Sequence, residues 1–124
     1  MDGIAELDFR DFARTAGAVV RYKAGAVIFE HGDEAEDMWI VLSGLVDIEA
    51  HDKLIETVGE NYALGILSLI DNLPRSSTAR AREASELVQI NSRKFRFMVE
   101  QMPLFGWYVM RQLADRLRAT NAAL

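Results

Sequence analysis

Short apolar runs separated by turn residues are the feature that most constrains the fold of this chain. Between residues 19 and 58, five runs rich in β-branched, aromatic and aliphatic residues end in turn sequences that contain Gly, Ser, Asp or Asn. The runs cover residues 19–22, 27–29, 38–42, 45–48 and 54–58. Turns that recur about every 8–12 residues are typical of a β-sandwich or β-barrel. The sequence therefore predicts a mainly β structure through this region.

Three other segments have helical patterns. Apolar residues across residues 4–16 have loose helical spacing, and Gly17 ends that run. Apolar residues are too crowded in residues 62–73 for an alternating strand, so we expect a short helix that begins near Gly65 and ends at Asp71-Asn72, since Pro74 prevents its continuation. Strands over residues 77–82 and 86–90 come next. Ser92 is the expected N-cap of a helix over 93–101, and Pro103 fits the first turn of a longer final helix.

These elements predict a β roll with flanking helices in one domain. The chain has 124 residues, which is a common domain size. We expect an N-terminal helical segment over residues 1–17, a β roll over 18–91 that contains a short internal helix, and C-terminal helices over 92–124. Half of the residues are hydrophobic, which is enough to form a buried core.

Composition excludes several function classes. The absence of cysteine excludes a disulfide framework, a thiolate metal site and a cysteine nucleophile. Only His31 and His51 are available as imidazole ligands, so a metal-holding β-barrel enzyme is disfavoured, and no metal or catalytic residue is predicted. A net charge of −5 argues against binding to nucleic acid or an anionic membrane. No run of about 18 apolar residues and no secretory signal is present, so we expect a cytoplasmic protein.

The segment from Leu64 to Thr78 has the composition of an anion-binding site. Gly65 opens the short apolar helix, and Arg75 follows the turn at Pro74 with hydroxyl residues after it. The start of a helix presents unpaired N–H groups and the positive end of a dipole, and an arginine adds a planar fork of donors. Together these groups suit a phosphate. A surface turn with a stabilising arginine is the alternative.

Three stretches in order make the chain resemble the cyclic nucleotide-binding domain family of catabolite activator-type regulators and protein kinase A regulatory subunits. Residues 26–33 look like the family's early strand and glycine turn, residues 38–46 resemble its most recognisable hairpin, and residues 64–78 resemble its phosphate-binding cassette. The resemblance covers the chain from about residue 19 to its end. It implies a jelly-roll β roll, also called a double-stranded β-helix, with a cyclic nucleotide bound inside.

The resemblance also implies the ligand contacts. The cassette arginine that pairs with the cyclic phosphate corresponds to Arg75. The accompanying hydroxyl and backbone N–H groups correspond to Ser76, Ser77, Gly65, Ile66 and Leu67. One position departs from the family pattern, in which glutamate follows the cassette glycine and accepts a hydrogen bond from the ribose 2′-hydroxyl. This chain has Ile66, which cannot accept a hydrogen bond and is expected to weaken ribose binding.

The final helix offers a second set of contacts. Arg116, Thr120 and Asn121 resemble the segment with which this helix covers the base in activator-type members of the family. An exposed polar helix face is the alternative for these residues. Apolar residues at spacings of three and four form a short seam along the same helix, which predicts either a homodimer or packing against the β roll. The seam contains Met110, Leu113, Leu117, Thr120 and Leu124.

The predicted function is a stand-alone regulatory sensor without catalysis. It would bind a cyclic purine nucleotide, cAMP in the first instance or cGMP, and would need no cofactor. It would signal to a separate, unknown protein partner because no DNA-binding segment follows the final helix in this sequence. The alternative is a degenerate member of the fold that has lost or changed its ligand and acts as a protein-interaction or dimerisation module. Arg75 and Ser76 favour the first hypothesis, whereas Ile66 favours the second.

Overall fold

The structure is a computed structural model and describes residues 8–123. Strands dominate the first three quarters of the chain, and two long helices follow. In chain order the elements are α2 Arg10–Ala16, β1 Ala18–Tyr22, β2 Val27–Phe29, β3 Asp37–Ser43, β4 Val46–Ala50, β5 Lys53–Val58, β6 Ala63–Leu64, α3 Ile66–Asp71, β7 Thr78–Ala81, β8 Ser85–Asn91, α4 Ser92–Gln101 and α5 Pro103–Ala122.

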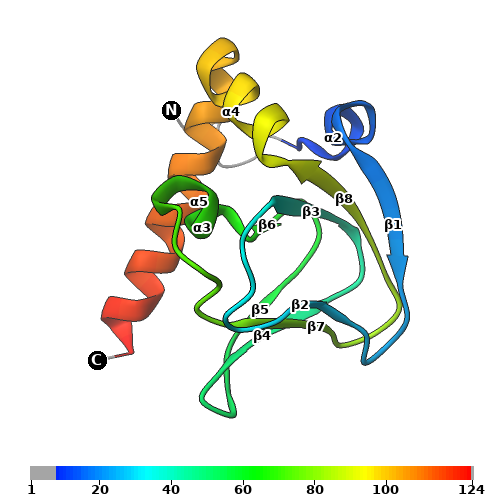
Figure 1. Cartoon of the computed structure of the whole chain (residues 1–124), viewed down its shortest axis with the longest axis vertical. Helices are drawn as coiled ribbons and strands as arrows, with labels where there is room; N and C mark the ends of the chain where they lie inside the picture. The colour runs from blue at the N-terminus through cyan, green and yellow to red at the C-terminus, as the bar shows by residue number, and fades with distance from the viewer. Residues whose placement is uncertain (1–7, 124) are drawn as a thin grey trace.

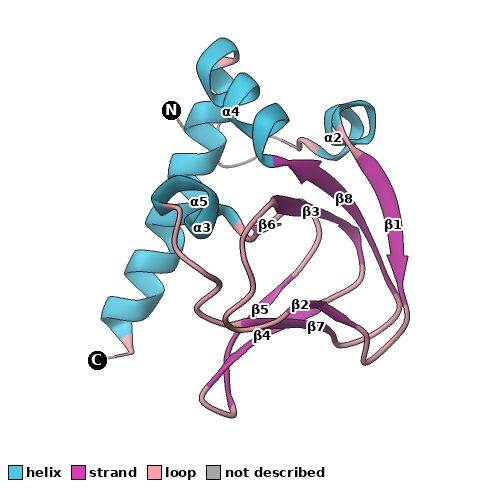
Figure 2. Cartoon of the chain, in the orientation of Figure 1, coloured by secondary structure: helices cyan, strands magenta, loops and turns pink. Residues whose placement is uncertain are grey.

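The strands form two four-stranded sheets. One has the order β1-β8-β3-β6 and the other β2-β7-β4-β5, and every pairing is antiparallel. Chain neighbours such as β1 and β2 lie in different sheets, so the chain crosses between the sheets as it advances. Figure 1 shows the sheets facing each other, and Figure 2 shows α3, α4 and α5 gathered to one side of them. The mainly β roll predicted from the turn spacing is confirmed.

Strand β3 is the centre of the fold because both of its faces are buried. Met38 and Ile40 point into a core between the first sheet and the helices, and Trp39 and Val41 point into a second core between the two sheets. Alternate strand residues face opposite sides of a sheet, so a strand covered on both sides must be apolar throughout. This explains the uninterrupted apolar run over residues 38–42.

Helices α4 and α5 close the outer face of the first sheet. Phe105 of α5 is fully buried and contacts Phe9 and Phe95 edge-on, with ring centroids 6.0 Å apart in each pair. Met98 of α4 is also fully buried in this core. The burial of large aromatic and aliphatic side chains is the main source of stability at such a contact. Helix α5 is thus firmly attached over its first half.

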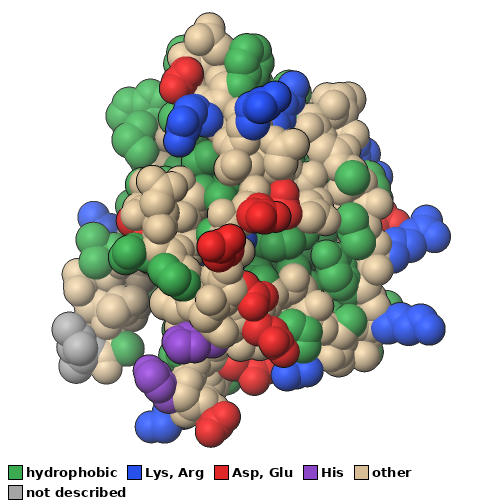
Figure 3. All heavy atoms as spheres, in the orientation of Figure 1, with side chains coloured by type: hydrophobic (Ala, Val, Ile, Leu, Met, Phe, Trp, Pro, Cys, Tyr) green, Lys and Arg blue, Asp and Glu red, His purple; other side chains and the backbone are tan. Residues whose placement is uncertain are grey.

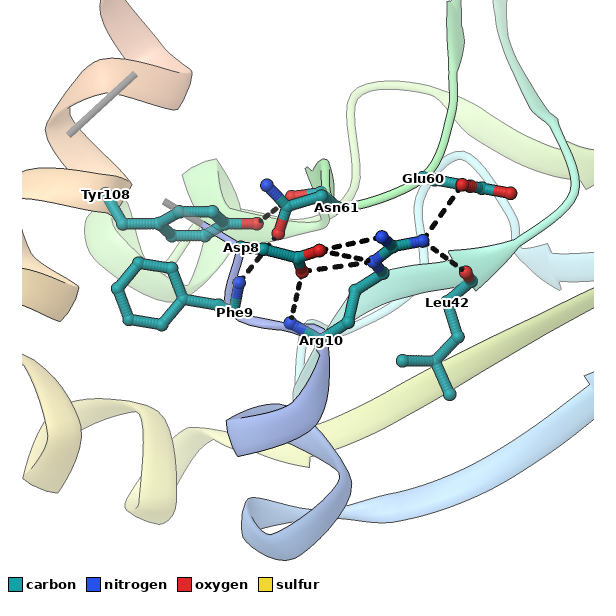
Figure 4. A network of polar contacts seen from close by, with 7 residues as sticks. All are labelled: Asp8, Phe9, Arg10, Leu42, Glu60, Asn61 and Tyr108. Atoms are coloured by element: carbon teal, nitrogen blue, oxygen red, sulfur yellow. Dashed lines mark hydrogen bonds and ion pairs between the residues drawn. The ribbon is translucent and has the colours of Figure 1, made fainter. Parts of the chain in front are cut away.

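A polar network joins the start of the described chain to the β5–β6 turn and to α5 (Figure 4). The carbonyl of Asn61 accepts from the Tyr108 hydroxyl at 2.6 Å, and its side-chain oxygen accepts from the Phe9 amide at 2.8 Å. Arg10 forms ion pairs with Asp8 at 2.7 Å and Glu60 at 2.9 Å. Burial raises the pKa of Tyr108, so this hydroxyl is a neutral donor at every physiological pH. The network fixes the turn that leads into β6 and α3.

The structure corrects the predicted elements in three places. Helix α2, the first helix among the described residues, begins at Arg10, and the predicted portion over residues 4–7 lies outside the described residues. The N-cap of α4 is Asn91, whose side chain accepts from the Lys94 amide at 2.8 Å, and Ser92 is the first helical residue. The helix predicted to begin near Gly65 is confirmed as α3, but the two-residue strand β6, which pairs with β3 just before it, was not predicted. A two-residue strand is too short for its sequence pattern to be distinguished from that of the helix next to it.

Candidate ligand-binding site

A pocket of about 140 Å³ lies where α3, the segment before β7, the inner face of β5 and helix α5 meet. Its wall combines apolar side chains from the roll with polar groups from the predicted cassette and from α5. The lining residues are Phe29, Ile48, Glu56, Leu64, Gly65, Ile66, Leu67, Ser68, Arg75, Ser76, Ser77 and Arg116. A concave, mostly apolar site with a few converging polar groups is the usual form of a small-molecule site.

Gly65 allows the cassette backbone to approach the arginine. Its φ is +82°, in the left-handed region, and a Cβ there would lie 3.0 Å from Arg75 Nη1 and 3.2 Å from the Trp39 ring. Both the backbone conformation and the tight contacts disfavour a side chain at this position. No side chain caps the first turn of α3, which begins directly after Gly65.

Arg75 lies inside the roll, with 4% of its surface exposed. Its Nη1 donates to the Gly65 carbonyl at 2.8 Å, and its Nη2 donates to the Asp37 carbonyl. The guanidinium carbon lies 4.4 Å from the centroid of the Phe29 ring and 5.5 Å from that of Trp39. Backbone carbonyls and aromatic faces therefore hold the guanidinium in one orientation.

The charge of Arg75 is incompletely compensated. Within residues 8–123 it forms no ion pair, and its buried Nε has no hydrogen-bond partner. Burial lowers the pKa of Arg75, and the negative charges of Asp37 and Asp33 oppose that shift. A buried cation with an unused donor is costly on its own and favours the entry of an anion. This is the electrostatic condition that a phosphate-binding arginine requires.

Arg116 reaches the opposite part of the same pocket from α5. Its Nε lies 3.0 Å from Glu56 Oε1 on β5, and its Nη2 donates to the Ala63 carbonyl on β6. One turn earlier on α5, the buried Gln112 side-chain oxygen accepts from the Ala63 amide at 3.0 Å. Two side chains of α5 therefore hold both backbone polar groups of Ala63, two residues before Gly65.

The structure brings most of the predicted site residues together. The residues that line the pocket are Gly65, Ile66, Leu67, Arg75, Ser76, Ser77 and Arg116. Thr120 and Asn121 do not line it: both are exposed, and the Thr120 hydroxyl donates to the Arg116 carbonyl at 3.0 Å on its own helix. Their predicted contact with a base remains a prediction that would require the end of α5 to move toward the pocket.

Ile66 contributes to the pocket wall, but its side chain is 1% exposed and belongs to the core between the first sheet and the helices. It packs in the same cluster as Met38 and Phe105. The residue thus has a structural role that explains its apolar character, independently of any ligand. A glutamate at this position would have to leave the core or be buried.

The sequence interpretation missed Glu56 and Gln112. Glu56 lies two residues before the buried Val58 on the inward face of β5, directly opposite Ile48 on β4. A charged residue at an inward position of a strand was the available signal. For Gln112 the sequence offered no such signal, because a glutamine on an amphipathic helix is usually exposed.

The profile of the cyclic nucleotide-binding domain matches residues 19–102. The chain belongs to the cyclic nucleotide-binding domain family. The resemblance inferred from the three sequence stretches is therefore confirmed, and so is the jelly-roll class of fold.

The relatives include regulators of transcription and of a protein kinase. A CRP-like cAMP-activated global transcriptional regulator of Mycobacterium tuberculosis is 28% identical over 107 residues, which cover 82% of this chain and 48% of the relative. The Thermus thermophilus catabolite activator protein superposes with a TM-score of 0.79 at 27% identity, covering 91% of this chain and 55% of that one. A cAMP-analogue-bound protein kinase A regulatory domain has a TM-score of 0.78 at 20% identity, with coverages of 98% and 83%, and shows the fold alone. The chain spans about half the length of the curated regulator it matches.

Membership defines the domain as a regulatory, cyclic nucleotide-binding module, although some relatives, such as the lysophospholipase NTE1 of Cryptococcus neoformans, are enzymes. None of the helices within residues 8–123 is long and apolar enough to cross a membrane. Acidic side chains gather near the middle of the face drawn in Figure 3, with Lys and Arg scattered around them. This face offers no continuous basic surface of the kind that nucleic-acid binding requires.

Proposed function

We propose that this domain is a non-catalytic sensor that binds a cyclic purine nucleotide in the pocket beside α3, with the cyclic phosphate at Arg75. The observation that carries this proposal is the buried Arg75 guanidinium, which has no ion pair within the described residues and an unused Nε donor. A cyclic phosphate brings one negative charge and several acceptor oxygens to such a group. Ser76, Ser77 and the amides of residues 65–67 lie in the same wall and would complete the phosphate site.

The signal would leave the pocket through α5. Gln112 and Arg116 bind the backbone of Ala63, which is followed after one residue by Gly65 and the cassette helix. A nucleotide that draws the cassette toward its phosphate would pull on β6 and hence on α5. Ligands shift such an equilibrium by the difference in their affinity for the two arrangements. The partner that reads this movement would be another protein.

A homodimer through α5 is part of the proposal. The outer side of α5 exposes large apolar residues, among them Leu104, Trp107, Met110 and Leu117, the last at 62% exposure. Leu113, another member of the predicted seam, packs against the domain's own core, and Leu124 lies outside the described residues. An apolar stripe of this length along a helix fits a second copy of the same helix. Light scattering of wild type and Leu117→Glu would test it, with a dimer expected for wild type and a monomer for the variant.

Calorimetric titration with cAMP, cGMP and 5′-AMP tests the proposed ligand class. We expect at least one cyclic nucleotide to bind at micromolar concentration or better, and 5′-AMP to bind more weakly because its dianionic, open phosphate does not match a site for a cyclic diester. If neither cyclic nucleotide binds, the proposed function is wrong. The remaining candidate is then the interaction module, which the exposed apolar residues of α5 favour.

A further inference from the structure

A carboxylate inside the roll is unexplained by a phosphate site. Glu56 projects from β5 on the face that also carries the buried Val58, and its register partner is Ile48 on β4. Its Oε1 accepts from Arg116 Nε at 3.0 Å, whereas its Oε2 has no hydrogen bond within the described part of the chain. An acceptor atom of a half-buried carboxylate is therefore available at the pocket wall.

Glu56 also occupies a boundary between two hollows. The pocket next to Arg75 has a volume of about 140 Å³, and a second hollow of about 260 Å³ lies between β5, Tyr62 and α5. Glu56 and Arg116 are the two residues that line both. The Glu56–Arg116 ion pair is thus the partition between the phosphate pocket and the second hollow.

The geometry of a cyclic nucleotide determines which part of the ligand lies next to the Glu56–Arg116 ion pair. In a 3′,5′-cyclic nucleotide the phosphate ring is fused to one side of the sugar, and the base leaves from C1′ on the other side. With the phosphate at Arg75, the base is the part that extends away from the cassette. Glu56 lines this pocket where it adjoins the second hollow, which Arg75 does not line, and Glu56 makes no hydrogen bond or ion pair with Arg75 within residues 8–123.

The two purines differ in what they offer to a carboxylate. Guanine presents two adjacent donors, N1–H and N2–H₂, which a carboxylate accepts with both oxygens. Adenine presents the single N6–H₂ donor flanked by acceptor nitrogens, which repel a carboxylate. A charge-assisted bond to each oxygen is also stronger than a neutral one.

The geometry points to Glu56 as the base-reading residue of this domain and to a guanine base, hence cGMP, as its preferred ligand. This inference rests on the proposed function, and it changes the ligand order expected from sequence, in which cAMP came first. Arg116 is the positioning residue. Its Nε binds Oε1 of Glu56, and this ion pair fixes the orientation of the carboxylate and therefore the direction of Oε2.

The test compares cGMP and cAMP affinities of wild type and Glu56→Gln by calorimetry. Wild type is expected to bind cGMP about tenfold or more tightly than cAMP. Glutamine keeps the shape and can still accept from Arg116, but it offers one acceptor and one donor group, which matches adenine. The variant is therefore expected to lose its preference for cGMP and to favour cAMP.

Asp47→Asn is the matched control. Asp47 is a carboxylate on the neighbouring strand β4, where it pairs with Arg82 at 2.9 Å, and it does not line the pocket. This variant should retain the wild-type ratio of cGMP to cAMP affinity. Circular dichroism and the melting temperature of each variant establish that it is folded before titration.

Four results would overturn the inference. Binding of cAMP as tightly as cGMP by wild type, or an unchanged ratio in Glu56→Gln, would remove Glu56 from base recognition while leaving the proposed function intact. A change confined to the ratio of cGMP to 2′-deoxy-cGMP would assign Glu56 to the sugar. Failure of wild type to bind either nucleotide would reject both the inference and the proposed function.

Discussion

Two arginines reach the same pocket in opposite electrostatic states. Arg75 is buried, held by the carbonyls of Gly65 and Asp37, and has no ion pair within the described residues. Arg116 is partly exposed and its charge is neutralised by Glu56. A ligand anion gains most from the cation whose charge is not already compensated. The comparison separates an arginine whose charge is available to a ligand anion from one that is already paired, although both line the pocket.

The surroundings of the two arginines also differ in rigidity. Around Arg75, the aromatic rings of Phe29 and Trp39 and the left-handed Gly65 pack closely against the guanidinium and hold it in place. Around Arg116, the contacts are made by long side chains of a helix with an exposed C-terminal half. A preformed anion site combined with an adjustable opposite wall is what a sensor needs, because only the adjustable part can report that the ligand has arrived.

Replacing Arg75 with methionine should give the largest effect. We expect cyclic nucleotide affinity to fall by about 2–5 kcal/mol, or roughly thirtyfold to several thousandfold, because the phosphate charge would be left unpaired inside the roll. The stability of the ligand-free protein should change by no more than about 1–2 kcal/mol, since the loss of two carbonyl hydrogen bonds is offset by removal of a desolvated charge. Calorimetry and urea unfolding measure the two quantities.

Arg80→Met is the control for Arg75→Met. Arg80 lies on β7, is exposed and pairs with Glu49 at 3.5 Å, so its removal should leave both affinity and stability nearly unchanged. If Arg75→Met bound the nucleotide as tightly as wild type, the distinction between the two pocket arginines would be wrong.

Replacing Ile66 with glutamate should mainly affect stability. Sequence reasoning predicts that Ile66→Glu restores a ribose acceptor and tightens binding by about 1.5–3 kcal/mol. The structure places this side chain in the core, so we expect the free energy of unfolding to fall by at least about 2 kcal/mol instead. Urea unfolding of Ile66→Glu, with Ile66→Leu as the size-matched control, measures this loss.

The two expectations for Ile66→Glu give different ligand results. A carboxylate that reaches the sugar would tighten cAMP binding and create a preference for cAMP over 2′-deoxy-cAMP. A carboxylate buried in the core would produce neither change. Tighter, ribose-selective binding without a loss of stability would show that residue 66 faces the ligand and that its burial here is not essential.

Sequence patterns predicted most of the strands, because the alternation of apolar runs and turn residues is a local property of the sequence. The alternation of apolar runs and turn residues reports burial directly, and β3 was recognised since a strand covered on both faces has no polar positions. Elements that depend on partners were missed. Strand β6 has two residues and exists because Ala63 and Leu64 pair with Ile40 and Trp39. The cap at Asn91 was displaced by one residue, which is within the ordinary uncertainty of a helix end.

Pocket residues that belong to one short sequence motif could be predicted, whereas those that only the fold brings together could not. Gly65 and Arg75 are ten residues apart, and the anion site predicted for this segment follows from their residue types. Glu56 becomes part of the pocket only because β5 pairs with β4 and α5 crosses the open end of the roll to place Arg116 beside it. That juxtaposition spans 60 residues of chain, and no local pattern encodes it.

Hydrogen exchange along α5 should show which end of the pocket responds to ligand. Saturating cyclic nucleotide is expected to slow amide exchange over residues 110–121 by about tenfold or more, which corresponds to about 1.4 kcal/mol of local stabilisation. Exchange in β3 should change less, since it is buried on both faces before the ligand arrives. Tight binding with unchanged exchange over residues 110–121 would make α5 a fixed scaffold and remove it from signal transmission.

Replacing Arg116 with methionine should give a small change in stability. The Arg116–Glu56 pair is partly exposed, with side-chain exposures of 27% and 33%, and the Ala63 carbonyl would also lose the donor that Arg116 provides, so we expect the free energy of unfolding to fall by about 1–2 kcal/mol. Gln112 would still hold the Ala63 amide, but Glu56 would lose its only hydrogen-bond partner within residues 8–123. We therefore expect the ligand-free variant to fold normally and to exchange faster over residues 116–121. A loss of several kcal/mol would instead show that the fold depends on Arg116, and its side chain would then not be an adjustable wall of the pocket.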